Sequence, residues 1–174
     1  MFSKEIYKTA NAQTSFIITA NFGLIREKGD KEIESDKLLY TMVQRDANNK
    51  AIKTLKFWQD LPQALYLMRL IDSGALFKSS KDQYEYKKTE KVNRAFKVSM
   101  KDKGEEKGKA VRFVIEEISK DKKEDKSFLY FDLTPKDARM MSHYVYLVIQ
   151  FYMNAYMLRQ LLKPNKKKQK DEEN

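Results

Sequence analysis

The sequence repeats one arrangement twice: a set of short alternating strands followed by a helix. In the first half, the strands run up to Lys56–Trp58, and the helix that follows begins at Asp60–Gln63 and is closed by Gly74. In the second half, the strands run up to Phe128–Phe131, and the helix begins at Thr134–Asp137. Each helix start has an Asp or Thr that can accept from backbone N–H groups and a proline in the first turn, where a missing N–H costs nothing. This repeat predicts an α+β fold with two antiparallel β-sheets, each of about four strands followed by a helix.

The predicted strands follow the two-residue period of a half-buried β-strand. In Ser15–Leu24, apolar side chains from Phe16 to Leu24 occupy one face and mostly polar ones the other, with Ile17 as the exception. The expected runs are Lys4–Thr9 (as an extra edge strand), Ser15–Leu24, Leu38–Arg45, Thr54–Trp58, Gln83–Lys88, Arg94–Lys101, Ala110–Ile118 and Ser127–Leu133. We expect charged hairpin loops at Glu27–Asp36, Asp46–Lys50, Asp102–Lys109 and Ser119–Lys126.

Length and composition favour a single folded domain over residues 1–163. A chain of 174 residues with 41% hydrophobic and 12% aromatic residues can bury a core. The segment 164–174 follows a proline and has no apolar residue to pack, so we expect a disordered charged tail. The first residues do not have the apolar core of a secretory signal, and the absence of cysteine suits a cytoplasmic protein.

The net charge of +10 is concentrated on the predicted sheets. Residues 78–130 hold sixteen Lys and Arg against eleven Asp and Glu, whereas the tail from 163 onward holds five against three. A basic sheet indicates binding to a polyanion more strongly than a basic tail does. The alternative is that lysines only keep strand edges soluble.

The final helix has no charged residue from Met140 to Leu158. Polar residues spread through this stretch disfavour a membrane span, so we expect no membrane partner. One stripe, from Ala138 through Val145 to Ala155, can cover a sheet. The opposite stripe then needs a second partner, which we expect to be another copy of the chain in a homodimer or homotetramer, unless the first helix or a loop covers it. The predicted oligomer interface consists of Tyr144, Leu147, Phe151 and Leu158.

The strand order resembles the Whirly-type single-stranded-DNA-binding fold and, more distantly, the positive-cofactor and PUR-repeat proteins. The local pattern lies in Leu67–Gly74, where a helix ends before the second strand set, and in Phe131–Ala138, where the last strand leads into the final helix. A Lys-Gly-Lys-Ala signature of the family also occurs, at Lys107–Ala110, but in the second half rather than the first, so we assign it no function. The resemblance implies two antiparallel sheets, helices that pack between subunits, and a strand surface that binds unpaired bases.

Basic and aromatic residues on the strands independently favour such a partner. Single strands are held by cations along the phosphates and by aromatic faces on which bases stack. Tyr84 and Tyr86 share one face of a strand beside two lysines, and the only tryptophan follows Lys56. The alternative for each ring is core packing. The predicted nucleic-acid-binding residues are Tyr40, Arg45, Lys56, Trp58, Tyr84, Tyr86, Lys87, Lys88, Arg94, Lys97 and Arg112.

The side chains needed for catalysis are scarce. There is one histidine, His143, which we expect to be buried or at an interface, and there is no cysteine nucleophile. Five glycines leave little for a phosphate-cradling loop, and Glu116 and Glu117 alternate between strand faces, although a nuclease with scattered carboxylates stays open. We therefore expect a non-enzymatic protein without cofactor or metal that binds single-stranded DNA or RNA, with DNA favoured and little sequence preference. The alternative is a scaffold protein that assembles through its final helix.

Overall fold

The computed structural model describes residues 2–28, 31–78, 83–88, 92–104, 108–119 and 126–161. They form an α+β fold with two antiparallel sheets and a long final helix, which confirms the predicted fold class at this level. The first sheet has the strand order β1 (Phe2–Ala10), β2 (Thr14–Lys28), β3 (Lys31–Arg45) and β4 (Ala51–Asp60). The second has the order β5 (Gln83–Lys88), β6 (Val92–Asp102), β7 (Lys109–Ser119) and β8 (Lys126–Leu133).

Helices follow each sheet, but the two halves are not identical. The first sheet leads into α1 (Leu61–Asp72) and the second into α3 (Pro135–Leu161). A four-residue helix, α2 (Ala75–Lys78), continues the chain directly after α1 and was not predicted from the sequence. Gly74 separates α1 from α2 with a φ of 75°, a conformation that glycine adopts at little cost.

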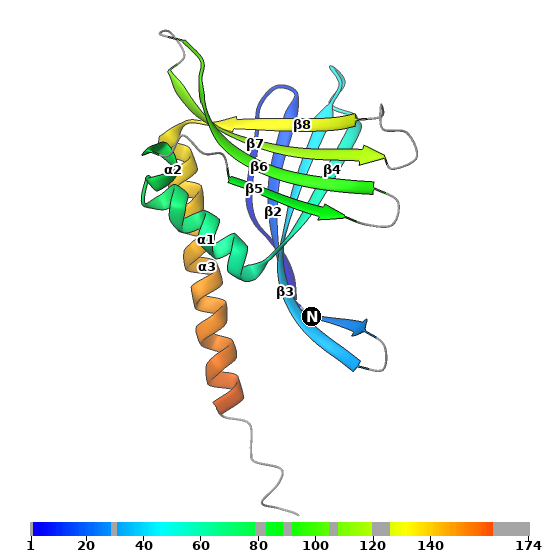
Figure 1. The fold of residues 1–174 in the computed structure, drawn as a ribbon, viewed down its shortest axis with the longest axis vertical. Coiled ribbons are helices and arrows are strands. Elements are labelled where there is room, and N and C mark those ends of the chain that lie inside the picture. The colour runs from blue at the N-terminus through cyan, green and yellow to red at the C-terminus, as the bar shows by residue number, and fades with distance from the viewer. Residues whose placement is uncertain are drawn as a thin grey trace, which may run out of the picture.

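The sheets pack face to face with their strands crossing, and the core between them is aromatic (Figure 1). Phe16 and Tyr40 of the first sheet meet Phe113 and Phe96 of the second. The ring centroids are 5.1 Å apart for Phe16 and Phe113 and 4.3 Å apart for Tyr40 and Phe96. All four rings are buried, so a large apolar area holds the two sheets together.

The two helix starts use different contacts. At α3, the Thr134 hydroxyl accepts from the Asp137 backbone N–H at 3.1 Å and contacts the Asp137 carboxylate at 2.7 Å, as a capping residue should. At α1, Asp60 occupies the capping position but makes no side-chain hydrogen bond to the helix. Its carboxylate pairs with Lys37 of β3 instead, so the predicted capping role of Asp60 is wrong.

The hairpin of β2 and β3 is longer than the sequence predicts. A loop was expected over Glu27–Asp36, but the strands stay paired as far as Lys28 and Lys31. The ladder is interrupted only at a bulge between Asn21 and Leu24, where Gly23 has a φ of 66° and its N–H donates to the Asp36 carboxylate. Figure 1 shows the outer part of this hairpin projecting beyond the two sheets.

The first part of α3 packs against the body of the molecule, and its C-terminal end projects away from it (Figure 1). The face of Ala138, Met141, Val145 and Ile149 is buried. Farther along, Tyr152 stacks on Phe22 of β2. None of the helices within the described ranges has the length and apolarity that crossing a bilayer requires. The predicted charged tail 164–174 lies outside the described residues.

Candidate nucleic-acid interface

The outward face of the second sheet carries exposed aromatic side chains. Along β8, Leu129, Phe131 and Leu133 are buried, whereas Phe128 and Tyr130 are 52% and 47% exposed. The period of two along a strand produces this division. Since β8 is an edge strand of the sheet, these two rings stand side by side at its border.

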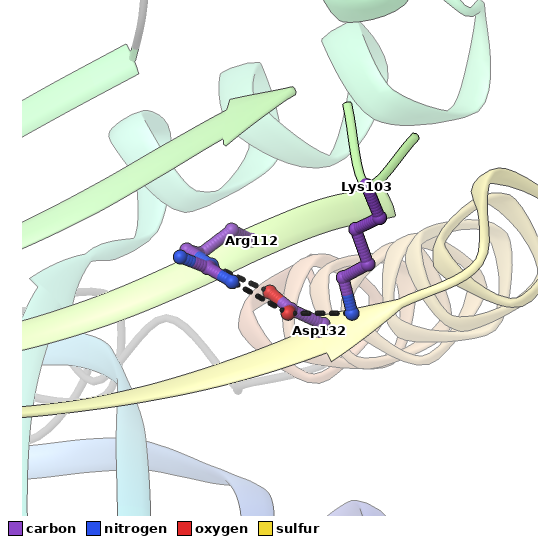
Figure 2. Close-up of polar contacts among 3 residues, drawn as sticks. All are labelled: Lys103, Arg112 and Asp132. Atoms are coloured by element: carbon purple, nitrogen blue, oxygen red, sulfur yellow. Dashed lines mark hydrogen bonds and ion pairs between the residues drawn. The ribbon is translucent and has the colours of Figure 1, made fainter. Parts of the chain in front are cut away.

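Arg112 of β7 lies over one of these rings. Its guanidinium carbon is 4.2 Å from the centroid of the Tyr130 ring, within the range of a cation–π contact. Figure 2 shows how Asp132 holds this guanidinium in place. The Nε and Nη2 atoms each donate to the Asp132 carboxylate at 2.8 Å, and Lys103 Nζ pairs with the same carboxylate at 2.7 Å.

The pKa values of this cluster shift toward the charged forms. Burial acts to raise the pKa of the Asp132 carboxyl, but hydrogen bonds from Arg112 and Lys103 outweigh it and hold that pKa below its ordinary value. The hydrogen bond to Asp132 also raises the pKa of the Arg112 guanidinium. At neutral pH, Arg112 is therefore a fixed, flat cation beside an exposed ring.

The outward face of the first sheet offers a second combination of cations and an aromatic ring. Trp58 is half-buried on this face, and Lys56, two residues earlier, is exposed. In the strand register Lys56 pairs with Thr41, Thr41 with Ile17, and Ile17 with Lys8, so the two lysines lie at opposite ends of one row. Neither lysine has an ion-pair partner within the part of the chain that the structure describes.

One predicted binding residue is wrong. Tyr40 lies in the core, fully buried between the sheets, and its hydroxyl donates to Gln59 Oε1 at 2.7 Å. Its ring stacks on Phe96 and cannot receive a base. The neighbouring alternation of Leu38, Tyr40 and Met42 places it on the apolar face of β3, and this sequence signal could have assigned it to the core.

The basic residues predicted to bind nucleic acid differ in the contacts that they already make within the protein. Arg94 is paired with Glu117, with Nε 2.7 Å from the carboxylate, and Arg112 is paired with Asp132 as described above. Arg45 donates through Nη1 to the Asn49 carbonyl at 3.1 Å. Lys97 lies half-buried opposite Val114 in the row that continues to Tyr130.

The side chains of Tyr84, Tyr86, Lys87 and Lys88 lie outside the described residues, although the backbone of β5 is described. Its register sets Tyr84 opposite Lys97, in the same cross-strand row as Tyr130.

Sequence reasoning missed Phe128, Tyr130 and Lys8. Every residue from Phe128 to Phe131 is apolar or aromatic, so the run gives no sign of which side faces solvent. The polar Asp132, two residues after Tyr130, was the available signal, because residues two apart share one face.

The predicted interface stripe on α3 is exposed. Leu147 is 51% and Phe151 78% exposed, and Tyr144 and Leu158 are exposed as well. Helix α1 contacts α3 elsewhere, through Arg69 and Tyr146, and within the described residues neither α1 nor a loop covers this stripe.

His143 is exposed in the single chain, so the expectation that it is buried is wrong, whereas the alternative, a place at a subunit interface, stays a prediction. Its Nδ1 lies 3.5 Å from the Asp72 carboxylate of α1, at the surface. Over the described ranges, no group of three or more His, Asp or Glu side chains could hold a metal ion.

Comparison with known proteins identifies the architecture. No family model and no curated protein matches the sequence, whereas solved structures do. The plant transcriptional regulator PBF-2 aligns with a TM-score of 0.64 at 10% identity, over 94% of this chain and 90% of that chain. WHY1 from Arabidopsis thaliana gives 0.56 at 11%, over 82% and 86%, and WHY3 from the same plant gives 0.59 at 10%, over 91% and 98%. The chain has a Whirly-like fold.

The Whirly-like architecture confirms the resemblance drawn from the strand and helix order. The likeness extends over nearly the whole chain, so it includes both sheets and α3. At about one identical residue in ten, it concerns the fold and not individual side chains.

Proposed function

We propose that this Whirly-like protein binds single-stranded nucleic acid, preferably DNA, with little sequence preference. The proposal rests on the surroundings of Tyr130. Its ring is about half exposed on an edge strand, and the Arg112 guanidinium lies against it. Unpaired bases stack on such rings, and every base has a face that can do so. The likeness of the fold to Whirly structures supports the proposal.

In this proposal, one set of residues stacks on the bases and another set contacts the phosphates. Phe128, Tyr130 and Trp58 supply rings, and the exposed Lys8 and Lys56 supply phosphate contacts. Arg45, Lys97 and the β5 residues Tyr84, Tyr86, Lys87 and Lys88 extend the same surfaces. Arg112 acts mainly through the Tyr130 ring, because Asp132 already occupies the Nε donor and one Nη2 donor of its guanidinium. Arg94 is paired with Glu117 and contributes less than Lys8 and Lys56, for which the described part of the chain offers no carboxylate partner.

We further propose that the protein assembles as a homodimer or homotetramer through α3. The stripe of Tyr144, Leu147, Phe151 and Leu158 is apolar and exposed, and an uncharged helix face of this kind is stable when it is buried against another helix. Several copies of the binding surface on one assembly raise affinity for a long strand without any new contact.

A scaffold function is the second candidate. It is favoured by the pairing of Arg94, Arg112, Lys103 and Lys126 with carboxylates, which reduces the charge available to a polyanion. In that case α3 alone carries the function, and the basic residues keep the protein soluble.

The substitution Tyr130→Ala tests the proposed function, with Tyr66→Ala as the matched control. Tyr66 is 60% exposed and belongs to helix α1 rather than to a strand of either sheet. Removing one stacked ring should weaken binding of a labelled single strand by about 1–3 kcal/mol, whereas Tyr66→Ala should leave it unchanged. Fluorescence anisotropy measures the affinity. Equal affinities for wild type and Tyr130→Ala would favour the scaffold function.

A further inference from the structure

A groove of about 300 Å³ lies where the second sheet meets one end of the first. One wall is the edge strand β8, with Phe128 and Tyr130. The other is formed by Asn11 and Gln13 in the β1–β2 turn and by Gln44 at the end of β3. The volume is at the lower end of ligand pockets, which run from about 300 to 1,000 Å³.

The aromatic wall is suited to a flat apolar ligand. Both rings are about half exposed, and Arg112 lies against Tyr130. Lys53 of β4 contacts the same strand, with Nζ 3.4 Å from the Phe128 carbonyl oxygen, and so places a positive charge at this corner of the molecule.

The opposite wall carries carboxamide side chains on a backbone that hydrogen bonds hold in place. Asn11 Oδ1 accepts from the N–H groups of Gln13 at 2.9 Å and Thr14 at 2.7 Å, which fixes the turn. The Gln13 carbonyl accepts from the Arg45 N–H at 2.8 Å, and Thr14 pairs with Gln44 in the ladder. The backbone of Gln13, in the turn before β2, is thereby held beside the end of β3, where Gln44 lies.

The amides of these two glutamines are available to a ligand. The Gln13 side chain is exposed and that of Gln44 partly so, and neither amide has a hydrogen-bond partner among the residues that the structure describes. A carboxamide offers a donor and an acceptor side by side, and the edge of an unpaired base offers both as well.

We propose that this groove binds one unpaired nucleobase, with its face against Phe128 and Tyr130 and its edge hydrogen-bonded by the Gln13 and Gln44 amides. Lys53 contacts the adjoining phosphate. The inference rests on the proposed function and extends it. Stacking contacts only the face of a base, whereas this site requires a base whose edge can form hydrogen bonds. Binding at this position therefore depends on the chemistry of the base as well as on its shape.

The experiment compares two oligonucleotides of equal length: oligothymidylate, and the same strand with thymine replaced by difluorotoluene, which has the shape of thymine but forms almost no hydrogen bonds. Affinities are measured by anisotropy for wild type, Gln13→Ala, and Gln13→Ala/Gln44→Ala. A control, Gln63→Ala, removes an exposed glutamine on α1. Gln13 lies in an exposed turn, so its single substitution tests the site even if the double variant folds poorly.

Wild type and Gln63→Ala should bind oligothymidylate about fivefold tighter than the isostere, the effect of roughly one neutral hydrogen bond. Gln13→Ala should reduce this ratio, and the double variant should bring it to about one. A wild-type ratio of one, or a ratio unchanged in both variants, would overturn the base-edge site while leaving single-strand binding in place. Failure of wild type to bind either strand would overturn the proposed function together with it.

Discussion

Asp132 controls the position of two cations on the outward face of the second sheet. Its carboxylate receives two hydrogen bonds from Arg112 and an ion pair from Lys103, all at 2.7–2.8 Å (Figure 2). Arg112 in turn lies against Tyr130. Asp132 is therefore a structural residue of the proposed binding surface, and its carboxylate reduces the local positive charge at the same time.

Asp132→Asn should lower the free energy of unfolding at pH 7 by about 1–2 kcal/mol, because hydrogen bonds between charged groups are lost at a partly exposed site. The folded-state pKa of Asp132 is below the ordinary value of 3.8, so this stability is present above that value and is lost as pH falls through the lower, folded pKa. The difference between wild type and variant should therefore shrink on acidification below about pH 4. Urea titrations at pH 7 and pH 3 measure it.

Glu116→Gln is the control for this prediction. Its pair with Lys126 is longer, at 3.4 Å, and should contribute less. A difference for Asp132→Asn that is the same at both pH values would contradict the electrostatic explanation.

The second prediction at this scale concerns Tyr40, whose hydroxyl donates to Gln59 inside the core. Tyr40→Phe should lower the free energy of unfolding by about 1 kcal/mol or somewhat more, because the buried Gln59 oxygen loses its donor. It should leave oligonucleotide affinity unchanged, since the ring is enclosed by Phe16 and Phe96. A variant that binds the oligonucleotide more weakly but is as stable as wild type would contradict the assignment of Tyr40 to the core.

At the scale of elements, alternation along the strands was sufficient to predict their existence and order. It located all eight strands, including the edge strand β1, and the Thr134 cap predicted the start of α3. It failed where both strand faces are polar or both are apolar. The outer β2–β3 hairpin is rich in charged residues, with Gly29 and Asp30 at its centre, and therefore has the composition of a loop. Phe128–Phe131 has no polar residue to mark the face toward solvent. The contacts of Asp132 could not be predicted either, because they depend on the register between β7 and β8.

Helix α3 is the element on which assembly depends. Leu147→Glu/Phe151→Glu places two charges on its exposed stripe, so the protein should become monomeric or aggregate, and binding to long strands should weaken through lost multivalency. Light scattering at micromolar concentration measures the assembly state. Tyr66→Glu, which adds a charge at another exposed aromatic position, should leave that state unchanged. A wild-type protein that is monomeric under these conditions would contradict the proposed interface.

At the scale of the whole molecule, the core leaves both outward sheet faces open. The aromatic cluster between the sheets uses one face of each, and α1 and the first half of α3 lie at one end of the structure (Figure 1). One outward face presents Phe128 and Tyr130. The other presents Trp58 with Lys8 and Lys56, which have no ion-pair partner among the described residues. The groove at Gln13 and Gln44 lies at the junction of the two sheets. A nucleic-acid strand bound in this groove would contact both sheets at once.

The most direct test of single-strand binding is an anisotropy titration of the full chain with single-stranded DNA, single-stranded RNA and duplex DNA at two salt concentrations. Single strands should bind more tightly than duplex, because stacking requires unpaired bases. With about four phosphate contacts, affinity should fall roughly 50-fold between about 50 and 200 mM salt through counterion release. Duplex binding as tight as single-strand binding, or binding that does not change with salt, would contradict the account.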